Sequence, residues 1–160
     1  PDWEHPVLRL HPDGRFLPTH DGDGVGLMFR PIVTQVSRWD RLKGWMPLLE
    51  GFLRLKRRYR GKRGASGRRR HRIEIARLVL AGPDPSAIQD DPEGREVLTA
   101  LCRTFCGLTP EEQESVALLS LPMTSGKQNH LMVNVIQRCS TMVVQNSLQE
   151  GFGLTATEAM

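Results

Sequence analysis

Two segments that lie far apart in the sequence combine residue types suited to binding phosphate and sugar. Residues 37–43 contribute the cations Arg38 and Lys43, and residues 146–153 contribute Glu150 and two glycines. Fixed positive charge neutralises a phosphate, glycine allows backbone N–H groups to approach an anion closely, and a carboxylate accepts hydrogen bonds from sugar hydroxyls. Together, the two segments suit a phosphorylated polyol.

The second segment leads into a predicted helix that adds groups of the same kind. Residues 154–160 have the pattern of a helix start, and the first backbone N–H groups of a helix point at a nearby anion. Glu158 follows Glu150 by eight residues, so the two carboxylates should hold different parts of one ligand. A structural alternative stays open, because Thr155 and Glu158 also form a capping box in which Glu158 only caps its own helix.

Apolar runs typical of buried strands alternate with amphipathic stretches typical of helices. The predicted strands are residues 32–37, 77–81, 116–121 and 141–145. The predicted helices are residues 42–53, 91–107, 131–139 and 154–160. Asp91 before Pro92 marks a helix start, and Thr109 followed by Glu112 forms a second capping box. The alternation predicts an α/β domain with a doubly wound parallel sheet and right-handed crossovers.

The predicted sheet explains how the two polar segments meet. In doubly wound sheets, ligands bind beyond the carboxyl ends of the strands, where the strand order reverses. An order of third, second, first and fourth strand puts this reversal between the first and fourth strands. Residues 37–43 and 146–153 would then face each other across one crevice, and this crevice is the predicted site.

The composition changes near Pro31, which we take as a domain boundary. Residues 1–30 are rich in Pro, Gly, Asp and His and predict an irregular connector, with a short hairpin around residues 7–10 and 15–17. Residues 31–160 predict the sheet domain. We expect this domain to be incomplete at its C-terminal end, because four strands make a small open sheet and the last helix has little to cover.

Four stretches of the sequence resemble retaining, nucleotide-sugar-dependent glycosyltransferases of the GT-B architecture. Residues 150–160 resemble the Glu-x7-Glu motif of that superfamily, and residues 36–44 resemble its Arg/Lys phosphate-binding segment. Residues 80–85 and 144–155 are closer still to the glycosyltransferring type of trehalose synthase. The similarity extends over residues 31–160, and the combination of the two motifs is more specific than either motif alone.

The resemblance implies a role for each candidate residue. Arg38 and Lys43 would neutralise the departing pyrophosphate, and Glu150 would hold hydroxyls of the donor hexose; these three residues are the implied catalytic set. The implied donor-binding set, which contacts the sugar, the phosphate and the ribose, is Gly151, Phe152, Gly153, Leu154, Thr155 and Glu158. In this superfamily the two cations take the part that metal ions play elsewhere, so neither a metal nor a resident cofactor is expected.

The resemblance also implies that the chain is a part of an enzyme. A GT-B enzyme has two Rossmann-like halves, and residues 1–30 match nothing in the N-terminal, acceptor-binding half. We therefore expect most of a donor-binding half, inactive alone, that takes ADP-glucose or UDP-glucose, with a glucose-like acceptor held by the missing half. Transfer would proceed with retention at the sugar carbon. An alternative is a nucleotide-sugar-binding remnant without catalytic activity.

The charge distribution supports a second, weaker alternative. The net charge is +4, but 11 of the 22 Lys and Arg residues lie between Arg54 and Arg72 without an acid, so the rest of the chain carries 11 basic and 18 acidic residues. We interpret this basic run as a solvated helix end followed by a flexible loop broken by glycines. Binding of nucleic acid through it is the alternative, although Tyr59 is its only aromatic residue for base stacking.

The remaining residues of chemical interest favour ordinary packing and a reducing compartment. Three cysteines do not make a disulfide framework, which favours the cytoplasm, as does the lack of a visible signal sequence or membrane-spanning stretch. Cys102 and Cys106 have no further ligands at zinc-site spacing. Trp39 and Trp45 are interpreted as core or interface residues rather than as substrate platforms.

Overall fold

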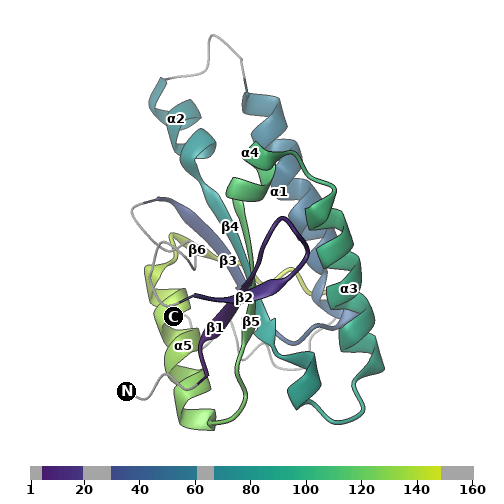
Figure 1. Cartoon of the computed structure of the whole chain (residues 1–160). Coiled ribbons are helices and arrows are strands. Elements are labelled where there is room, and N and C mark those ends of the chain that lie inside the picture. Colours follow the sequence, from purple (N-terminus) through teal and green to yellow (C-terminus); the bar gives the residue numbers. More distant parts are fainter. Residues whose placement is uncertain (1–4, 20–29, 61–66, 149–160) are drawn as a thin grey trace.

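A six-stranded, mostly parallel sheet lies at the centre of the computed structural model (Figure 1), which describes residues 5–19, 30–60 and 67–148. The parallel strands are β3 (Ile32–Val36), β4 (Arg77–Pro83), β5 (Val116–Leu121) and β6 (Met142–Val143). The antiparallel strands are β1 (Val7–Leu10) and β2 (Phe16–Thr19). Across the sheet the order is β2-β1-β5-β4-β3-β6.

The order of the four parallel strands confirms the predicted doubly wound sheet. Strand β4 pairs with one edge of β3, and β5 continues the sheet beyond β4. Strand β6 pairs with the other edge of β3. The strand order therefore reverses between β3 and β6, which are the first and fourth predicted strands, as the predicted crevice requires.

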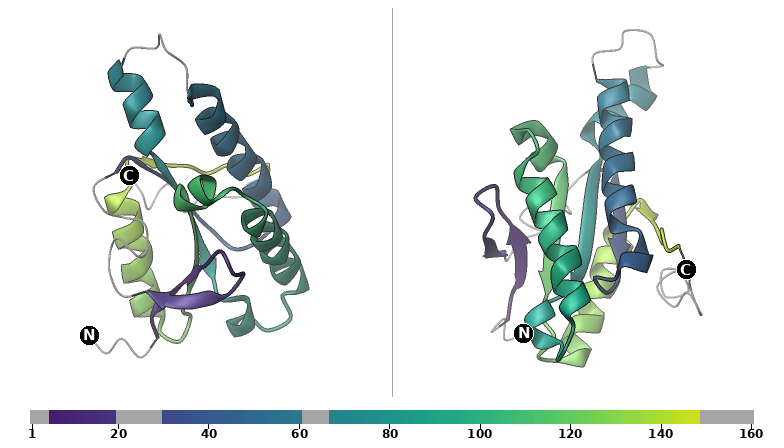
Figure 2. Two further views of the ribbon diagram at one scale, coloured as in Figure 1. Left: turned by 45° about the horizontal axis from the view of Figure 1, so that its top comes forward. Right: turned by 90° about the vertical axis from the view of Figure 1, so that its right-hand side faces the viewer.

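Helices cover both faces of the sheet, as Figure 2 shows. The helices are η1 (Arg41–Lys43), α1 (Trp45–Tyr59), α2 (Gly67–Ile75), η2 (Pro85–Ala87), α3 (Pro92–Cys106), α4 (Pro110–Glu114) and α5 (Gly126–Cys139). Helices α1 and α3 cover one face and α5 covers the other. Among the described residues, no helix combines the length and apolar character needed to cross a membrane.

The alternation of side chains along the central strands explains this two-faced core. Leu78, Leu80 and Leu118 are fully buried in the cluster that contains α1 and α3. The intervening residues Val79 and Ala117 belong to the cluster under α5. Because successive side chains of a strand point to opposite faces, a nearly all-apolar strand needs a helical layer on each side.

Two predicted helix starts, those at Asp91 and Thr109, are confirmed. The Asp91 side chain accepts a hydrogen bond from the Gly94 N–H at 2.8 Å, which caps α3, and Pro92 occupies its first turn. Thr109 and Glu112 form the reciprocal capping box at the start of α4. These caps satisfy N–H groups that have no partner within the helix, so local sequence sets where the two helices begin.

The N-terminal hairpin is part of the sheet. The sequence predicts the hairpin itself, and β1 and β2 form it. It does not predict that β1 also pairs antiparallel with β5, at Leu8 opposite Ser120. Val7 and Leu10 of β1 are buried, so residues 7–19 contribute to the same core as the parallel strands.

The basic run between Arg54 and Arg72 is more ordered than the sequence predicts. The second helix, α2, begins at Gly67 where a flexible loop is expected, and this prediction is wrong for residues 67–72. The Lys56 ammonium, at the C-terminal end of α1, donates to the carbonyl oxygens of Glu74 (2.6 Å) and Ala76 (2.9 Å). The Glu74 carbonyl belongs to the last turn of α2, and the Ala76 carbonyl follows directly after it. Carbonyls at the end of a helix lack partners within the helix, so a cation stabilises them.

Acidic residues of α4 neutralise part of this basic run. The Arg57 guanidinium pairs with Glu112 at 2.7 Å, and Arg60 pairs with Glu111. The hydrogen bond from Arg57 is the main reason why the pKa of the Glu112 carboxyl lies below its ordinary value. The ionised form of Glu112 therefore favours the folded state above the unfolded-state pKa of about 4.3.

The substitution Glu112→Gln tests this ion pair. We expect it to lower the free energy of unfolding at pH 7 by about 0.5–1 kcal/mol and to have little effect at pH 3, because the stabilisation is lost as pH falls through the lowered folded pKa. Urea unfolding at both pH values measures the difference. Glu114→Gln is the control, since Glu114 is an exposed acid of α4 without an ion pair in the described part. An equal loss at both pH values would contradict the electrostatic origin.

Candidate functional site

The loops that follow β3 and β6 lie side by side. After β3, the chain turns through residues 37–40 into η1. After β6, residues 144–148 run past the same place, and the Leu148 N–H donates to the Leu42 carbonyl at 2.7 Å. The structure therefore brings together the first predicted segment and the start of the second.

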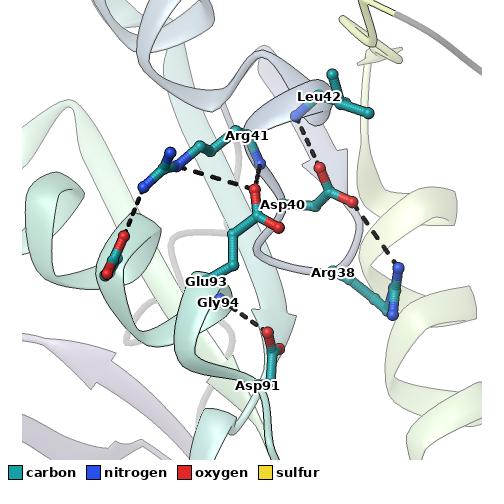
Figure 3. Close-up of polar contacts among 8 residues, drawn as sticks. Arg38, Asp40, Arg41, Leu42, Asp91, Glu93 and Gly94 are labelled. Atoms are coloured by element: carbon teal, nitrogen blue, oxygen red, sulfur yellow. Dashed lines mark hydrogen bonds and ion pairs between the residues drawn. The ribbon is translucent and has the colours of Figure 1, made fainter.

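Arg38 presents its charge to solvent at the carboxyl end of β3. Its side chain is 72% exposed, and its only described ion pair is a long contact, 3.8 Å from Nη2 to Oδ2 of Asp40. The Asp40 carboxylate also accepts a 2.7 Å hydrogen bond from the Leu42 N–H, which caps η1. Asp40 thus fixes the turn while the Arg38 guanidinium stays accessible to an anion (Figure 3).

Arg41 has the opposite arrangement, although it lies only three residues further on. Its guanidinium pairs with Glu96 at 2.5 Å and lies 3.8 Å from Glu93, both on α3. In Figure 3, Arg38 and Arg41 extend to opposite sides of Asp40. Two carboxylates neutralise Arg41, so Arg38 and not Arg41 is the arginine of this loop that is suited to a phosphate.

Lys43 ends η1 and is half-buried. Its carbonyl oxygen accepts a 2.8 Å hydrogen bond from the side-chain amide of Gln35. The other end of that amide, Oε1, accepts from the Asn146 N–H at 3.2 Å. The Asn146 side chain in turn donates to the Gly44 carbonyl at 2.9 Å. We call these three hydrogen bonds the Gln35–Asn146 clamp.

Gly44 makes the close approach of the two loops possible. Its φ of 61° lies in the left-handed region that favours glycine. A Cβ at this position would lie 2.2 Å from the Asn146 carbonyl oxygen. Sequence reasoning missed the roles of Gly44, Gln35 and Asn146; the amide side chain of Gln35 inside a strand predicted to be buried was the available signal for Gln35.

Two buried tryptophans pack against each other next to the Arg38 backbone, which confirms their interpretation as packing residues. Trp39 and Trp45 are 1% and 2% exposed, and their ring centroids lie 4.6 Å apart. The Trp39 indole N–H donates to the Pro83 carbonyl at 2.7 Å, and that of Trp45 donates to the Arg38 carbonyl at 3.1 Å. These two hydrogen bonds fix the Trp39 side chain and the Arg38 carbonyl in this turn.

A cleft of about 440 Å³ lies beside the loop, between α1 and α3. Its lining is mainly apolar, with the Arg41–Glu96 ion pair among its polar groups. It differs from the predicted crevice, which is expected on the side of the loop that faces β6, where the Leu148 N–H contacts the Leu42 carbonyl directly. We do not assign the phosphate site to this cleft, because the arginine that lines it is already neutralised.

The other predicted site residues lie outside the described residues. They are Glu150, Gly151, Phe152, Gly153, Leu154, Thr155 and Glu158. The described chain ends at Leu148, two residues before Glu150, and is bound there to Leu42. Of the predicted set, the structure thus places Arg38 and Lys43 and the chain that leads to the remainder.

Cys102 lacks the features of a reactive thiol. Burial is the main reason why the pKa of the Cys102 thiol is raised to about 11, so this thiol stays protonated and unreactive at neutral pH. Within the described part of the chain, no three His, Cys, Asp or Glu side chains are grouped as metal ligands.

Comparison with known proteins relates the chain to trehalose synthases. It is 31% identical to the trehalose synthases of Thermococcus litoralis and Pyrococcus furiosus and 32% identical to that of Pyrococcus horikoshii, each over 131 residues. The matched region is 82% of this chain and 26% of each relative. This segment is trehalose synthase-like. No family model matches the chain.

The chain spans about a quarter of the length of the curated relatives that it matches. A shared segment of this size, together with the Rossmann-like sheet, supports a trehalose synthase-like relationship. The position of Arg38 and Lys43 at the carboxyl end of a central strand agrees with the place where such sheets bind ligands. These observations are the basis of the functional proposal that follows.

Proposed function

We propose that this chain is the donor-binding part of a retaining GT-B glycosyltransferase that transfers glucose from a nucleotide sugar to a sugar acceptor. The observation that carries the proposal is the accessible charge of Arg38 at the point where the strand order reverses, next to the loop that leads to Glu150. The similarity to trehalose synthases supports the proposed class of reaction.

The reaction requires positive charge where the nucleoside diphosphate departs. When the bond between the sugar and the diphosphate breaks, negative charge develops on the leaving phosphate oxygen. Preorganised cations stabilise that charge, and one such group lowers the barrier by about 3–4 kcal/mol. Arg38 and Lys43 would supply this charge, so the proposed reaction needs no metal ion at the diphosphate.

The remaining assignments extend the proposal to the residues after Leu148. Glu150 would accept hydrogen bonds from hydroxyls of the donor glucose, and Glu158 from hydroxyls of the ribose. The backbone amides of residues 152–154 would bind the sugar and the phosphate. Retention would follow if the leaving phosphate assists attack of the acceptor on the same face of the sugar.

Calorimetric titration of the protein at its full genomic length tests donor binding. We expect ADP-glucose or UDP-glucose to bind with a Kd between about 1 μM and 1 mM, the usual range for substrates, and GDP-mannose to bind more weakly. Binding without formation of any glycoside product would favour a non-catalytic nucleotide-sugar-binding protein. Failure of all three nucleotide sugars to bind would overturn the proposal.

A further inference from the structure

The Gln35–Asn146 clamp connects the two loops through the main chain. Three consecutive carbonyl groups, those of Leu42, Lys43 and Gly44, each accept a hydrogen bond from residues 146–148 or from β3. The donors are the Leu148 N–H, the Gln35 side chain and the Asn146 side chain, respectively. The segment with the predicted cation Lys43 is thereby fixed to the segment that continues toward Glu150.

Gln35 is the central member of this clamp. It is 1% exposed and lies in β3, among apolar residues. Its amide nitrogen donates to the Lys43 carbonyl, and its amide oxygen accepts from the Asn146 N–H. A buried amide is costly unless both ends are paired. Here one end is paired with the loop after β3 and the other with the loop after β6.

We propose that Gln35 and Asn146 are positioning residues that set the distance between the two loops for one ligand group, the diphosphate of a nucleotide sugar. This inference rests on the proposed function. A diphosphate must be held from both sides, and binding sites lose affinity when the groups that hold a ligand are displaced by about 1 Å. Gln35 acts without touching the ligand, because it is buried beneath the loop.

A second buried glutamine provides a matched comparison. Gln113 is 9% exposed, and its side-chain amide donates to the Phe105 carbonyl at 3.1 Å. It joins α4 to α3 just before β5 begins. This place lies at the amino ends of the parallel strands, opposite their carboxyl ends. Gln35 and Gln113 thus both donate a side-chain amide hydrogen bond to a backbone carbonyl, but only Gln35 contacts the two loops of the predicted site.

The test compares Gln35→Leu with Gln113→Leu in the protein at its full genomic length. Both substitutions should lower the melting temperature, because each removes a hydrogen bond between a buried side-chain amide and a backbone carbonyl. Calorimetry should show that only Gln35→Leu weakens binding of ADP-glucose or UDP-glucose, by about tenfold or more. It should also reduce the preference for ADP over AMP, because the clamp serves the diphosphate; a purely structural role would leave that preference unchanged.

Asn146→Ala keeps the test decisive if Gln35→Leu does not fold. It removes the bond to Gly44 but leaves the backbone bond to Gln35, so we expect a smaller loss in the same direction. Wild-type affinity and wild-type ADP preference in a folded clamp variant would overturn the inference while the proposed function stands. If the wild-type protein binds no nucleotide sugar, the proposed function fails, and the inference fails with it.

Discussion

Replacing Arg38 by alanine is expected to lower turnover by about 10²–10³-fold, the usual cost of removing one group that stabilises charge in the transition state. Arg38 is the accessible arginine of the site loop, and a weak contact with Asp40 is its only ion pair in the described residues. Formation of glycoside product from ADP-glucose or UDP-glucose and glucose, by the protein at its full genomic length, measures the effect. Lys43→Ala and Glu150→Ala should show losses of similar size.

Arg41→Ala is the matched control for this prediction. Arg41 is an arginine of the same loop, and its side chain is 67% exposed, close to the 72% of Arg38. Its charge is already neutralised by Glu93 and Glu96, so its removal should change turnover by less than about threefold, as expected for an exposed ion pair. Equal losses in the two variants, or unchanged turnover in Arg38→Ala, would remove Arg38 from the site.

Gly44→Ala is expected to have the largest effect on stability. A residue with a side chain at φ of 61° is strained by about 1–3 kcal/mol. The added Cβ would also collide with the Asn146 carbonyl oxygen, and overpacking of this kind costs about 1–3 kcal/mol. We therefore expect a loss of about 2–6 kcal/mol in the free energy of unfolding, measured by urea denaturation, together with weaker donor binding.

Gly51→Ala is the corresponding control, because it makes the same chemical change where nothing opposes it. Gly51 lies inside α1, and a Cβ built there has no atom within 4 Å. Alanine in a helix interior is about 0.5–1 kcal/mol more favourable than glycine, so this variant should be more stable than the wild type. A Gly44→Ala variant as stable as Gly51→Ala would show that the two loops are not held together as described.

Most of the parallel sheet could be predicted from local patterns. The strands at 77–81 and 116–121 are short, continuous apolar runs, and the Asp91 and Thr109 caps mark helix starts in the sequence itself. Such signals depend on neighbouring residues only, so no tertiary information is needed to find them. The strand order could then be inferred from the rules that govern doubly wound sheets.

The features that were missed depend on contacts between distant residues. Helix α2 contains no buried residue, so it has no apolar stripe to indicate a helix, and the Lys56 side chain supports its end from α1. The pairing of β1 with β5 joins segments more than 100 residues apart. Neither contact leaves a periodic pattern in the sequence.

The same reason separates the predicted site residues from the clamp. Arg38 and Lys43 carry charges that indicate phosphate binding from their residue type alone. Gln35 and Asn146 are neutral, and their importance follows from a contact across 111 positions of the sequence. Residue type therefore predicts which groups would touch a ligand, while the groups that hold the two loops together required the structure.

The two edges of the sheet differ in their capacity to accept another strand. At one edge, Pro18 of β2 lacks an N–H group and is exposed, and proline on an edge strand opposes further pairing. At the other edge, β6 is the last strand among the described residues. Any additional strand contributed by a longer polypeptide should therefore join at β6. The predicted crevice between the β3 and β6 loops would then lie near the middle of the sheet rather than near its margin.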